Sequence, residues 1–202
     1  MTVKTITAIG RSKIKIEPEE GPSFVLSRKD AFLLGIQEGA LLDADICEQI
    51  SQILRRECLR KCGMLLQTRE YSENALREKL EHAFFPQEIA EGVLSELRKA
   101  GYLNEDRMAE DYIRIHLKDR SRKRIENDLM NKGLSEHTIR LAFGRAEEEA
   151  DLGELEKAQI LKILEKKRFD PALAGWEETM KIKAFLYRKG YSQEAVRDVL
   201  GR

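Results

Sequence analysis

The sequence has little that would suit a membrane, a disulfide framework or a metal centre. Its 202 residues contain no apolar run near the ~18 residues of a membrane span, and the start, MTVKTITAIG, lacks the pattern of a secretion signal. We therefore expect a cytoplasmic protein with no membrane partner. Three cysteines, an odd number, argue against a disulfide framework. Cys58 and Cys62 lie one helical turn apart without a histidine at ligand spacing, so we interpret them as buried apolar side chains and expect no metal.

The motifs of common active sites are also missing. The chain has no phosphate loop of the form Gly-x-x-x-x-Gly-Lys-Ser, no Gly-x-Gly-x-x-Gly and no His-Glu-x-x-His. Its carboxylates alternate with lysine and arginine, which is typical of exposed helix faces. We therefore expect no enzymatic activity, no cofactor and no small-molecule substrate.

Aromatic residues are scarce at 6%, whereas charged residues reach 36%, against roughly 25% in an average globular protein. This much charge needs a large surface, and slim helices with solvated faces supply more surface than a thick α/β core. The net charge is zero, so any attraction to nucleic acid must come from local patches.

The first thirty residues differ from the rest of the chain. Residues 13–17 (KIKIE) alternate strictly between polar and apolar, and residues 6–10 (ITAIG) and 21–27 (GPSFVLS) supply two further short strand-like runs. We predict a small antiparallel sheet. Ser27 is expected to cap a short helix through Leu34, and helices follow to the end of the chain.

Two later stretches repeat one pattern without a gap, LMNKGLSEHTIRLAF at residues 129–143 and LYRKGYSQEAVRDVL at residues 186–200. In each, a glycine suits the left-handed end of a helix and a serine two residues later suits the next N-cap. Apolar residues before and after the serine can pair as a hydrophobic staple. These positions are Gly133, Leu134, Ser135 and Ile139 in one copy and Gly190, Tyr191, Ser192 and Val196 in the other.

A third, altered copy occupies residues 80–94 (LEHAFFPQEIAEGVL). We read it as one residue shorter before the turn, with Phe84 and Ile89 as the staple and Pro86 at the first helical position. Three copies predict a mostly α protein, with tandem three-helix repeats in an elongated curved array and a small N-terminal antiparallel β element.

The expected organisation has four parts. A β-containing extension spans residues 1–42, helical unit one 43–117, helical unit two 118–168, and a truncated unit three 169–202. In this scheme the helix after Asn104 is the third helix of unit one, and a helix from about Leu152 through Leu164 is the third helix of unit two.

Charge is segregated in the middle of the chain. Residues 118–145 carry eight basic and four acidic residues, and residues 147–156 carry six acids and no base. A basic stretch of this kind can hold phosphates, and an acidic one can meet a basic protein surface. Plain solvated helix ends are the other interpretation. The candidate residues for binding DNA or a protein partner are Lys118, Arg120, Arg122, Lys123, Arg124, Lys132 and Arg140.

Four motifs in order resemble the RecX family, over roughly residues 64–202. They are an R-x-x-S-x-x-x-L-x-x-K-L pattern that starts at Arg69, then GYLNEDRMA at 101–109, KRIENDLMNKGL at 123–134 and FLYRKGYSQEAVRDVL at 185–200. One departure is the segment Asp119–Arg120–Ser121–Arg122, where many members have a Gly-Pro-like turn; it adds positive charge.

The resemblance implies tandem three-helix units and a regulator that binds RecA nucleoprotein filaments, acts in DNA repair and recombination, and restrains recombinase and ATPase activity. The implied partners are the RecA filament and single- or double-stranded DNA. Two other readings stay open: a helix–turn–helix transcription regulator, and a helical scaffold that touches only protein. Against the first, the last helical stretch has only Arg197 and Arg202 as bases.

Overall fold

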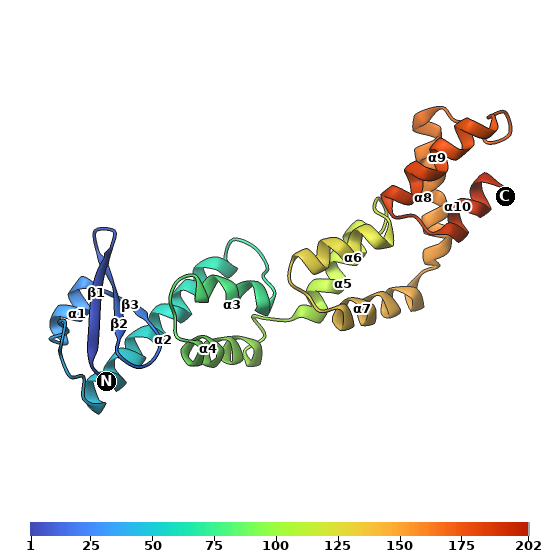
Figure 1. Cartoon of the computed structure of the whole chain (residues 1–202). Helices are drawn as coiled ribbons and strands as arrows, with labels where there is room; N and C mark the ends of the chain where they lie inside the picture. Colours follow the sequence, from blue (N-terminus) through green and yellow to red (C-terminus); the bar gives the residue numbers. More distant parts are fainter. Residues whose placement is uncertain (202) are drawn as a thin grey trace. The chain divides into compact units, whose positions relative to one another are not determined.

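The computed structural model describes residues 1–201 and is mostly helical, with one small sheet near the N-terminus (Figure 1). The chain forms two compact units, Met1–Asn104 and Glu105–Arg202, here called unit 1 and unit 2. The predicted fold class, mostly α with an antiparallel β element, is confirmed. Unit 1 contains β1 (Val3–Ile9), β2 (Lys13–Pro18), β3 (Phe24–Ser27), α1 (Arg28–Leu33), α2 (Ala44–Leu66), α3 (Glu73–Glu81) and α4 (Gln87–Lys99).

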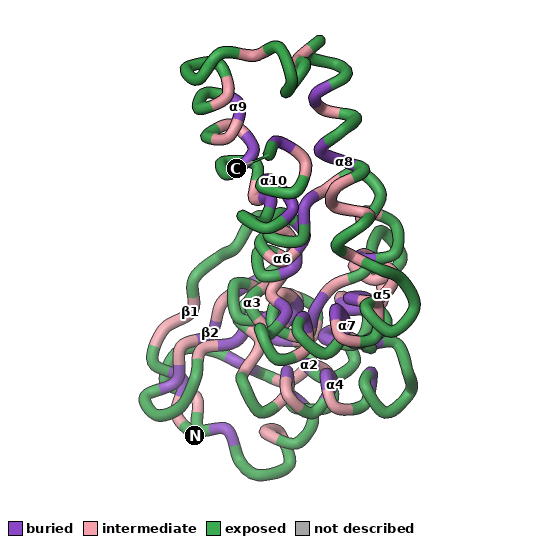
Figure 2. The backbone as a smooth tube through the Cα atoms, turned by 90° about the vertical axis from the view of Figure 1, so that its right-hand side faces the viewer, coloured by how far each residue is buried: buried purple, intermediate pink, exposed green. Residues whose placement is uncertain are grey.

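Unit 2 is entirely helical within the described residues. Its helices are α5 (Glu105–His116), α6 (Arg122–Asn131), α7 (Glu136–Glu149), α8 (Leu152–Lys167), α9 (Trp176–Lys189) and α10 (Gln193–Leu200). Buried positions recur as short stretches along the helices, whereas most connecting loops are exposed (Figure 2).

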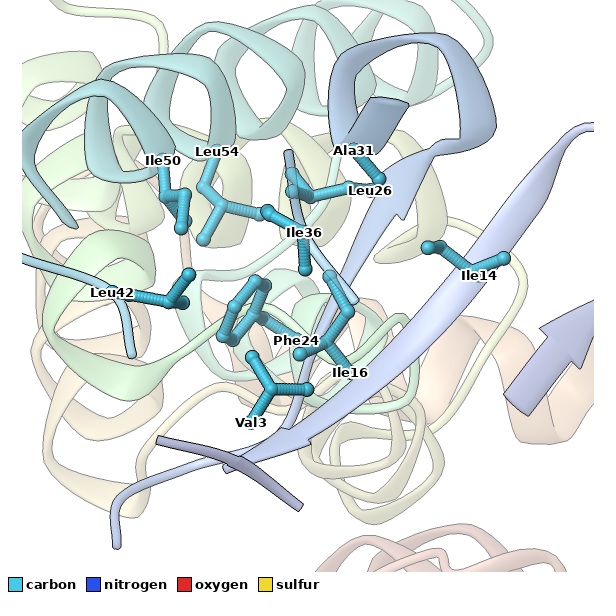
Figure 3. Close-up of a cluster of buried hydrophobic side chains, with 10 residues drawn as sticks. All are labelled: Val3, Ile14, Ile16, Phe24, Leu26, Ala31, Ile36, Leu42, Ile50 and Leu54. Atoms are coloured by element: carbon cyan, nitrogen blue, oxygen red, sulfur yellow. The ribbon is translucent and has the colours of Figure 1, made fainter. Parts of the chain in front are cut away.

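The sheet has the strand order β1-β2-β3, and both strand pairs are antiparallel. The alternation in β2 places Ile14 and Ile16 on the buried side, as the sequence predicts. Figure 3 shows Phe24 of β3 beside Ile16 and Val3, close to Leu42 and below Ile50 of α2. One face of the sheet is therefore covered by α2, which stabilises three strands too small to be stable alone.

Unit 1 has a second apolar core between α2, α3 and α4. It includes Cys58 and Cys62, which are fully buried as predicted. Phe85 and Ile89 pack against this core and also against the core beneath the sheet. The two cores of unit 1 are therefore joined by apolar side chains.

Unit 2 also has two apolar cores. One lies between α5, α6 and α7 around Phe143, and the other lies between α8, α9 and α10 around Leu186. Within residues 105–201, no apolar residue packs against both of them.

The three repeated corners have one geometry. The backbone N–H of Phe85, Leu134 and Tyr191 donates to the carbonyl oxygen five residues earlier, at Leu80, Leu129 and Leu186. Gly133 and Gly190 both have φ of 89°, and Ser135 and Ser192 cap α7 and α10 through their hydroxyls, which confirms the predicted stop and start signals.

The interpretation of the altered copy was wrong about the length of its turn and about the positions of Phe84 and Pro86. Its turn has the same length as the others, because Phe84 occupies the left-handed position with φ of 60°. Pro86 is the N-cap of α4, not its first helical residue, and Phe85 is the residue before the cap. The sequence misled because a left-handed phenylalanine is rare and costs roughly 1–2 kcal/mol relative to glycine.

The helices also group differently from the expected ranges. The sequence predicts the helix after Asn104 as the third helix of helical unit one, but α5 packs with α6 and α7. Likewise, the helix at 152–164 belongs to α8, which packs with α10. An amphipathic pattern shows that a helix packs through its apolar face, but it does not indicate which other helix covers that face. As a division into folding domains, the four ranges stay a prediction.

Candidate functional site

The most basic part of the stretch at 118–145 is residues 118–124, here called the basic segment. It lies at the start of α6, next to the end of α9 (Figure 1). Ser121 is the N-cap of α6 and its hydroxyl accepts from the backbone N–H of Arg124. The same hydroxyl donates to the carbonyl oxygen of Lys189 at 2.6 Å, and Ser121 is only 3% exposed. This buried hydrogen bond brings together two segments that are 68 residues apart.

Gly190 allows the close approach of these segments. A Cβ at this position would lie 2.9 Å from Oγ of Ser121 and 3.0 Å from Cβ of Lys123. At Gly101, another left-handed corner glycine, a Cβ would meet nothing within 4 Å. Gly190 therefore serves both the turn and the contact between α6 and the α9–α10 corner.

A hollow of about 810 Å³, here called the α6–α9 hollow, opens where these segments meet. Five basic side chains and one acid, Asp119, line it, so its local charge is positive although the whole chain is neutral. The basic residues are Arg120, Lys123, Arg124, Arg188 and Lys189.

Two of these arginines share one carboxylate. The nearest nitrogens of Arg120 and Arg124 lie 2.7 and 3.3 Å from the oxygens of Asp128, and Arg120 also donates to the hydroxyl of Tyr112. Burial alone would raise the pKa of Asp128, but the hydrogen bond from Arg120 and the charges of both arginines outweigh it, so the pKa is lowered. Arg120 is therefore held in place at the edge of the hollow.

The other basic side chains of the hollow are less engaged. Lys123, Arg188 and Lys189 are exposed, and no carboxylate of residues 1–201 forms an ion pair with them. The ammonium of Lys189 lies 5.7 Å from the ring centroid of Phe185. These three side chains present charge that an external anion can use.

Of the seven candidates, the structure brings three to this hollow: Arg120, Lys123 and Arg124. Arg122 points elsewhere, because it bonds Glu126 and Glu147 and lies 4.6 Å from the ring centroid of Phe143, tying α6 to α7. The remaining three are separate from the hollow. Lys118 lines a different hollow with Arg114, Lys132 lies 5.2 Å from the Tyr112 ring centroid, and Arg140 is near His137 on α7.

Arg188 and Lys189 line the hollow but are not among the residues predicted from the sequence. They stand directly before Gly190 in the second copy of the corner, where the first copy has Asn131 and Lys132. The added arginine was the available signal, but only Lys132 and Arg140 of the first copy were taken as candidates within a repeated corner.

Gln159 of α8 fixes the loop that carries the basic segment. Its Nε2 donates to the carbonyl oxygens of Leu117 and Arg120 at 2.6 and 3.3 Å, and the side chain is buried. Ser121 and Gln159 therefore make polar contacts between the two bundles of unit 2, beside an apolar contact from Leu152 of α8, which packs against the core of α5, α6 and α7.

Neither a metal site nor a membrane span emerges from the described part of the chain. No group of three or more histidine, cysteine, aspartate or glutamate side chains there is placed to hold a metal ion. None of its helices is long and apolar enough to cross a membrane.

Comparison with known sequences identifies the family. The chain is 30% identical over 145 residues to the regulatory protein RecX of Trichlorobacter lovleyi, which covers 71% of this chain and 93% of the relative. The chain belongs to the RecX family. It is also 26% identical over 197 residues to the regulatory protein RecX of Clostridium perfringens strain 13, covering 95% of this chain and 90% of the relative. A family model described as "RecX, third three-helix domain" matches residues 154–200, which include most of α8 and all of α9 and α10.

Solved RecX structures share the fold. One crystal structure of regulatory protein RecX matches with a TM-score of 0.62 at 21% identity, covering 98% of each chain. The crystal structure of RecX from Lactobacillus salivarius matches with a TM-score of 0.61 at 17% identity, covering 73% of this chain and 94% of that one. The resemblance seen in the four sequence motifs is thus confirmed, and the relatives are named as regulatory proteins.

Proposed function

We propose that this protein binds RecA nucleoprotein filaments and restrains their recombinase and ATPase activities during DNA repair and recombination. The observation that carries the proposal is the match to regulatory RecX proteins over 90% or more of the relatives' length. In this proposal the protein is a regulator without catalysis of its own and acts in the cytoplasm.

The basic residues supply the contact to filament DNA. Lys123, Arg188 and Lys189 are exposed and approach phosphates, while Arg120 and Arg124 are held by Asp128 at the same edge. Of the other candidates, Lys118, Lys132 and Arg140 lie outside the hollow and are proposed as further contacts to DNA or RecA. Arg122, with its two carboxylate partners, is the weakest of the seven.

The acidic segment at 147–156 is proposed to contact RecA itself through Glu148 and Glu149, which are exposed. Other acids of this segment have partners inside the chain. Glu147 bonds Arg122, Glu154 bonds Lys157, and Glu156 accepts from Ser192.

RecA's DNA-dependent ATPase rate tests the proposal. Filaments assembled on circular single-stranded DNA are titrated with this protein, and co-sedimentation measures how much of it is bound. We expect the ATPase rate and strand exchange to fall as bound protein increases. An unchanged ATPase rate on filaments saturated with the protein would contradict inhibition, and a rise would reverse its sign.

A further inference from the structure

A second basic hollow adjoins the first. This α8–α9 hollow, of about 730 Å³, is lined by Lys167, Arg168, Lys181 and Arg188 together with two acids, Asp170 and Glu178. It shares Phe185 and Arg188 with the α6–α9 hollow. The two hollows form one continuous surface, here called the basic track, which runs from the start of α6 across α9 to the α8–α9 corner.

Arg168 has an unusual backbone. It is the C-cap of α8 with φ of 53°, a left-handed position, and the N–H of the next residue, Phe169, donates to Leu164 as at the other corners. Glycine fills the same position at residues 101, 133 and 190. A strained arginine where glycine would fit better is the kind of outlier found where function requires a side chain. Here the side chain adds a charge to the track.

Aromatic rings lie among the basic side chains of the track. The ammonium groups of Lys167 and Lys189 are 4.3 and 5.7 Å from the ring centroid of Phe185, so this ring helps to hold both lysines in the track. Tyr187 lines the α6–α9 hollow and is 42% exposed. Proteins bind single-stranded nucleic acid by combining an accessible aromatic ring with a row of basic side chains. The nucleobases of a single strand are free to stack on such a ring.

We propose that the basic track binds single-stranded DNA, with its phosphates on Lys123, Arg168, Arg188 and Lys189 and one base stacked on Tyr187. The inference rests on the proposed function and specifies the site and the form of the DNA. A duplex can use the charges, but its bases are already stacked and cannot use Tyr187. An acidic protein segment can also use the charges and would not need a stacking face.

Fluorescence anisotropy of a labelled oligothymidylate, with the full chain and without RecA, tests the charges. A lost phosphate contact to a single strand lowers the slope of log K against log salt by about 0.7. For Arg188→Ala/Lys189→Ala we therefore expect a slope smaller by about 1.4 and affinity about 25-fold lower at 0.1 M salt.

The matched control is Lys162→Ala/Arg197→Ala, which removes the same charge from exposed positions of α8 and α10 that line neither hollow. We expect this variant to bind nearly as the parent does. Equal losses in the two double variants would overturn the track, because they would show attraction to the general charge of the bundle.

Arg168→Gly separates binding from folding. Glycine relieves the left-handed backbone, so we expect Tm to stay the same or rise, while affinity for the single strand falls by about fivefold at 0.1 M salt. Affinity equal to that of the parent protein would remove Arg168 from the track.

Variants of Tyr187 test whether the track prefers single-stranded DNA to duplex DNA. For Tyr187→Ala we expect at least about a fivefold loss for the single strand, the lower end for one stacked base, and little change for a hairpin duplex. Tyr187→Phe keeps the ring and should bind like the parent. An unchanged single-strand affinity in Tyr187→Ala, or equal losses for both DNA forms, would overturn the stacking contact and favour a binding mode that uses charge alone.

The two proposals fail separately. If the track variants lose affinity for the oligonucleotide as expected but the parent protein leaves RecA's ATPase unchanged, the track stands and filament regulation fails. If the track variants lose no DNA affinity while the parent protein still inhibits RecA, the track fails and regulation stands.

Discussion

The two units of this protein join their cores in different ways. In unit 1, Phe85 and Ile89 pack against both the core beneath the sheet and the core of α2, α3 and α4. In unit 2, no described apolar residue packs against both cores. Hydrogen bonds join them, from Ser121 to the carbonyl of Lys189 and from Gln159 to the carbonyls of Leu117 and Arg120, beside a single apolar contact of Leu152 of α8 with the core of α5, α6 and α7.

The difference has consequences for function. Apolar contacts between cores exclude water and are not directional, so they suit a part of the molecule that only needs to be stable. A join made of hydrogen bonds fixes the relative orientation of the two segments, because hydrogen bonds are directional, and it leaves neighbouring charged side chains in water. The α6–α9 hollow with its bases lies at the polar join, which places the candidate site at the boundary between two small bundles.

The largest effect is expected from breaking the apolar join. Phe85→Ala should lower the free energy of unfolding of unit 1 by about 3 kcal/mol, because the ring serves two cores. Chemical denaturation gives the magnitude, and hydrogen exchange should show reduced protection in both the sheet and α3–α4. Phe32→Ala, which truncates a ring that is 84% exposed, is the control and should change stability by less than about 0.5 kcal/mol. Loss of protection in α3–α4 alone would contradict a shared join.

Next in size is the close approach at the polar join. Gly190→Ala should cost about 2–3 kcal/mol, because the left-handed backbone is strained and the new Cβ meets Oγ of Ser121. Gly101→Ala has the same backbone problem in open space and should cost about 1 kcal/mol. Thermal unfolding of the two variants makes the comparison. Equal costs would mean that the α6 contact adds nothing.

A smaller difference is expected between two serine caps. Ser121→Ala removes an N-cap and the buried hydrogen bond to Lys189, so it should cost about 2 kcal/mol. Ser135→Ala removes an exposed N-cap and an exposed hydrogen bond with the Thr138 hydroxyl, and should cost about 1 kcal/mol. Urea denaturation of both variants checks the order, and an inverted order would refute the structural weight given to the Ser121–Lys189 bond.

The smallest effect concerns the carboxylate between two arginines. Folding lowers the pKa of Asp128 below its ordinary 3.8, so its contribution is present above that value and is lost as pH falls through the folded pKa. Asp128→Asn should therefore be less stable than the parent at pH 7, by about 1 kcal/mol or less, and the difference should vanish in acid. Denaturation curves at several pH values measure it, and a gap that persists at the lowest pH would exclude an electrostatic origin.

Structure that depends on neighbours along the chain could be predicted from the sequence at particular residues. The alternation of Lys13–Ile16 gave β2, and the glycines and serines of the two copies gave corners with φ of 89° and side-chain caps. Each signal acts within about one turn of chain, where steric limits and single hydrogen bonds decide the outcome.

Structure that depends on residues far apart in the chain could not be predicted from the sequence. Phe84 takes a left-handed position that its residue type disfavours, and Lys15 of β2 lies 4.8 Å from its ring centroid. The apolar face of α5 was clear, but the choice of α6 and α7 as its partners was not. Of the seven candidate residues, three line the hollow. Arg122 does not, because it pairs with carboxylates on α6 and α7.

The sequence alone determined the helical corners, the small sheet and, through the order of its motifs, the RecX family. Only the tertiary structure decided where the bases gather. Arg188 and Lys189 join Lys123 because a buried hydroxyl reaches a carbonyl 68 residues away and a glycine leaves room for that contact. A corner is made by neighbours along the chain, whereas a binding surface is made by neighbours in space, and those depend on how the bundles pack.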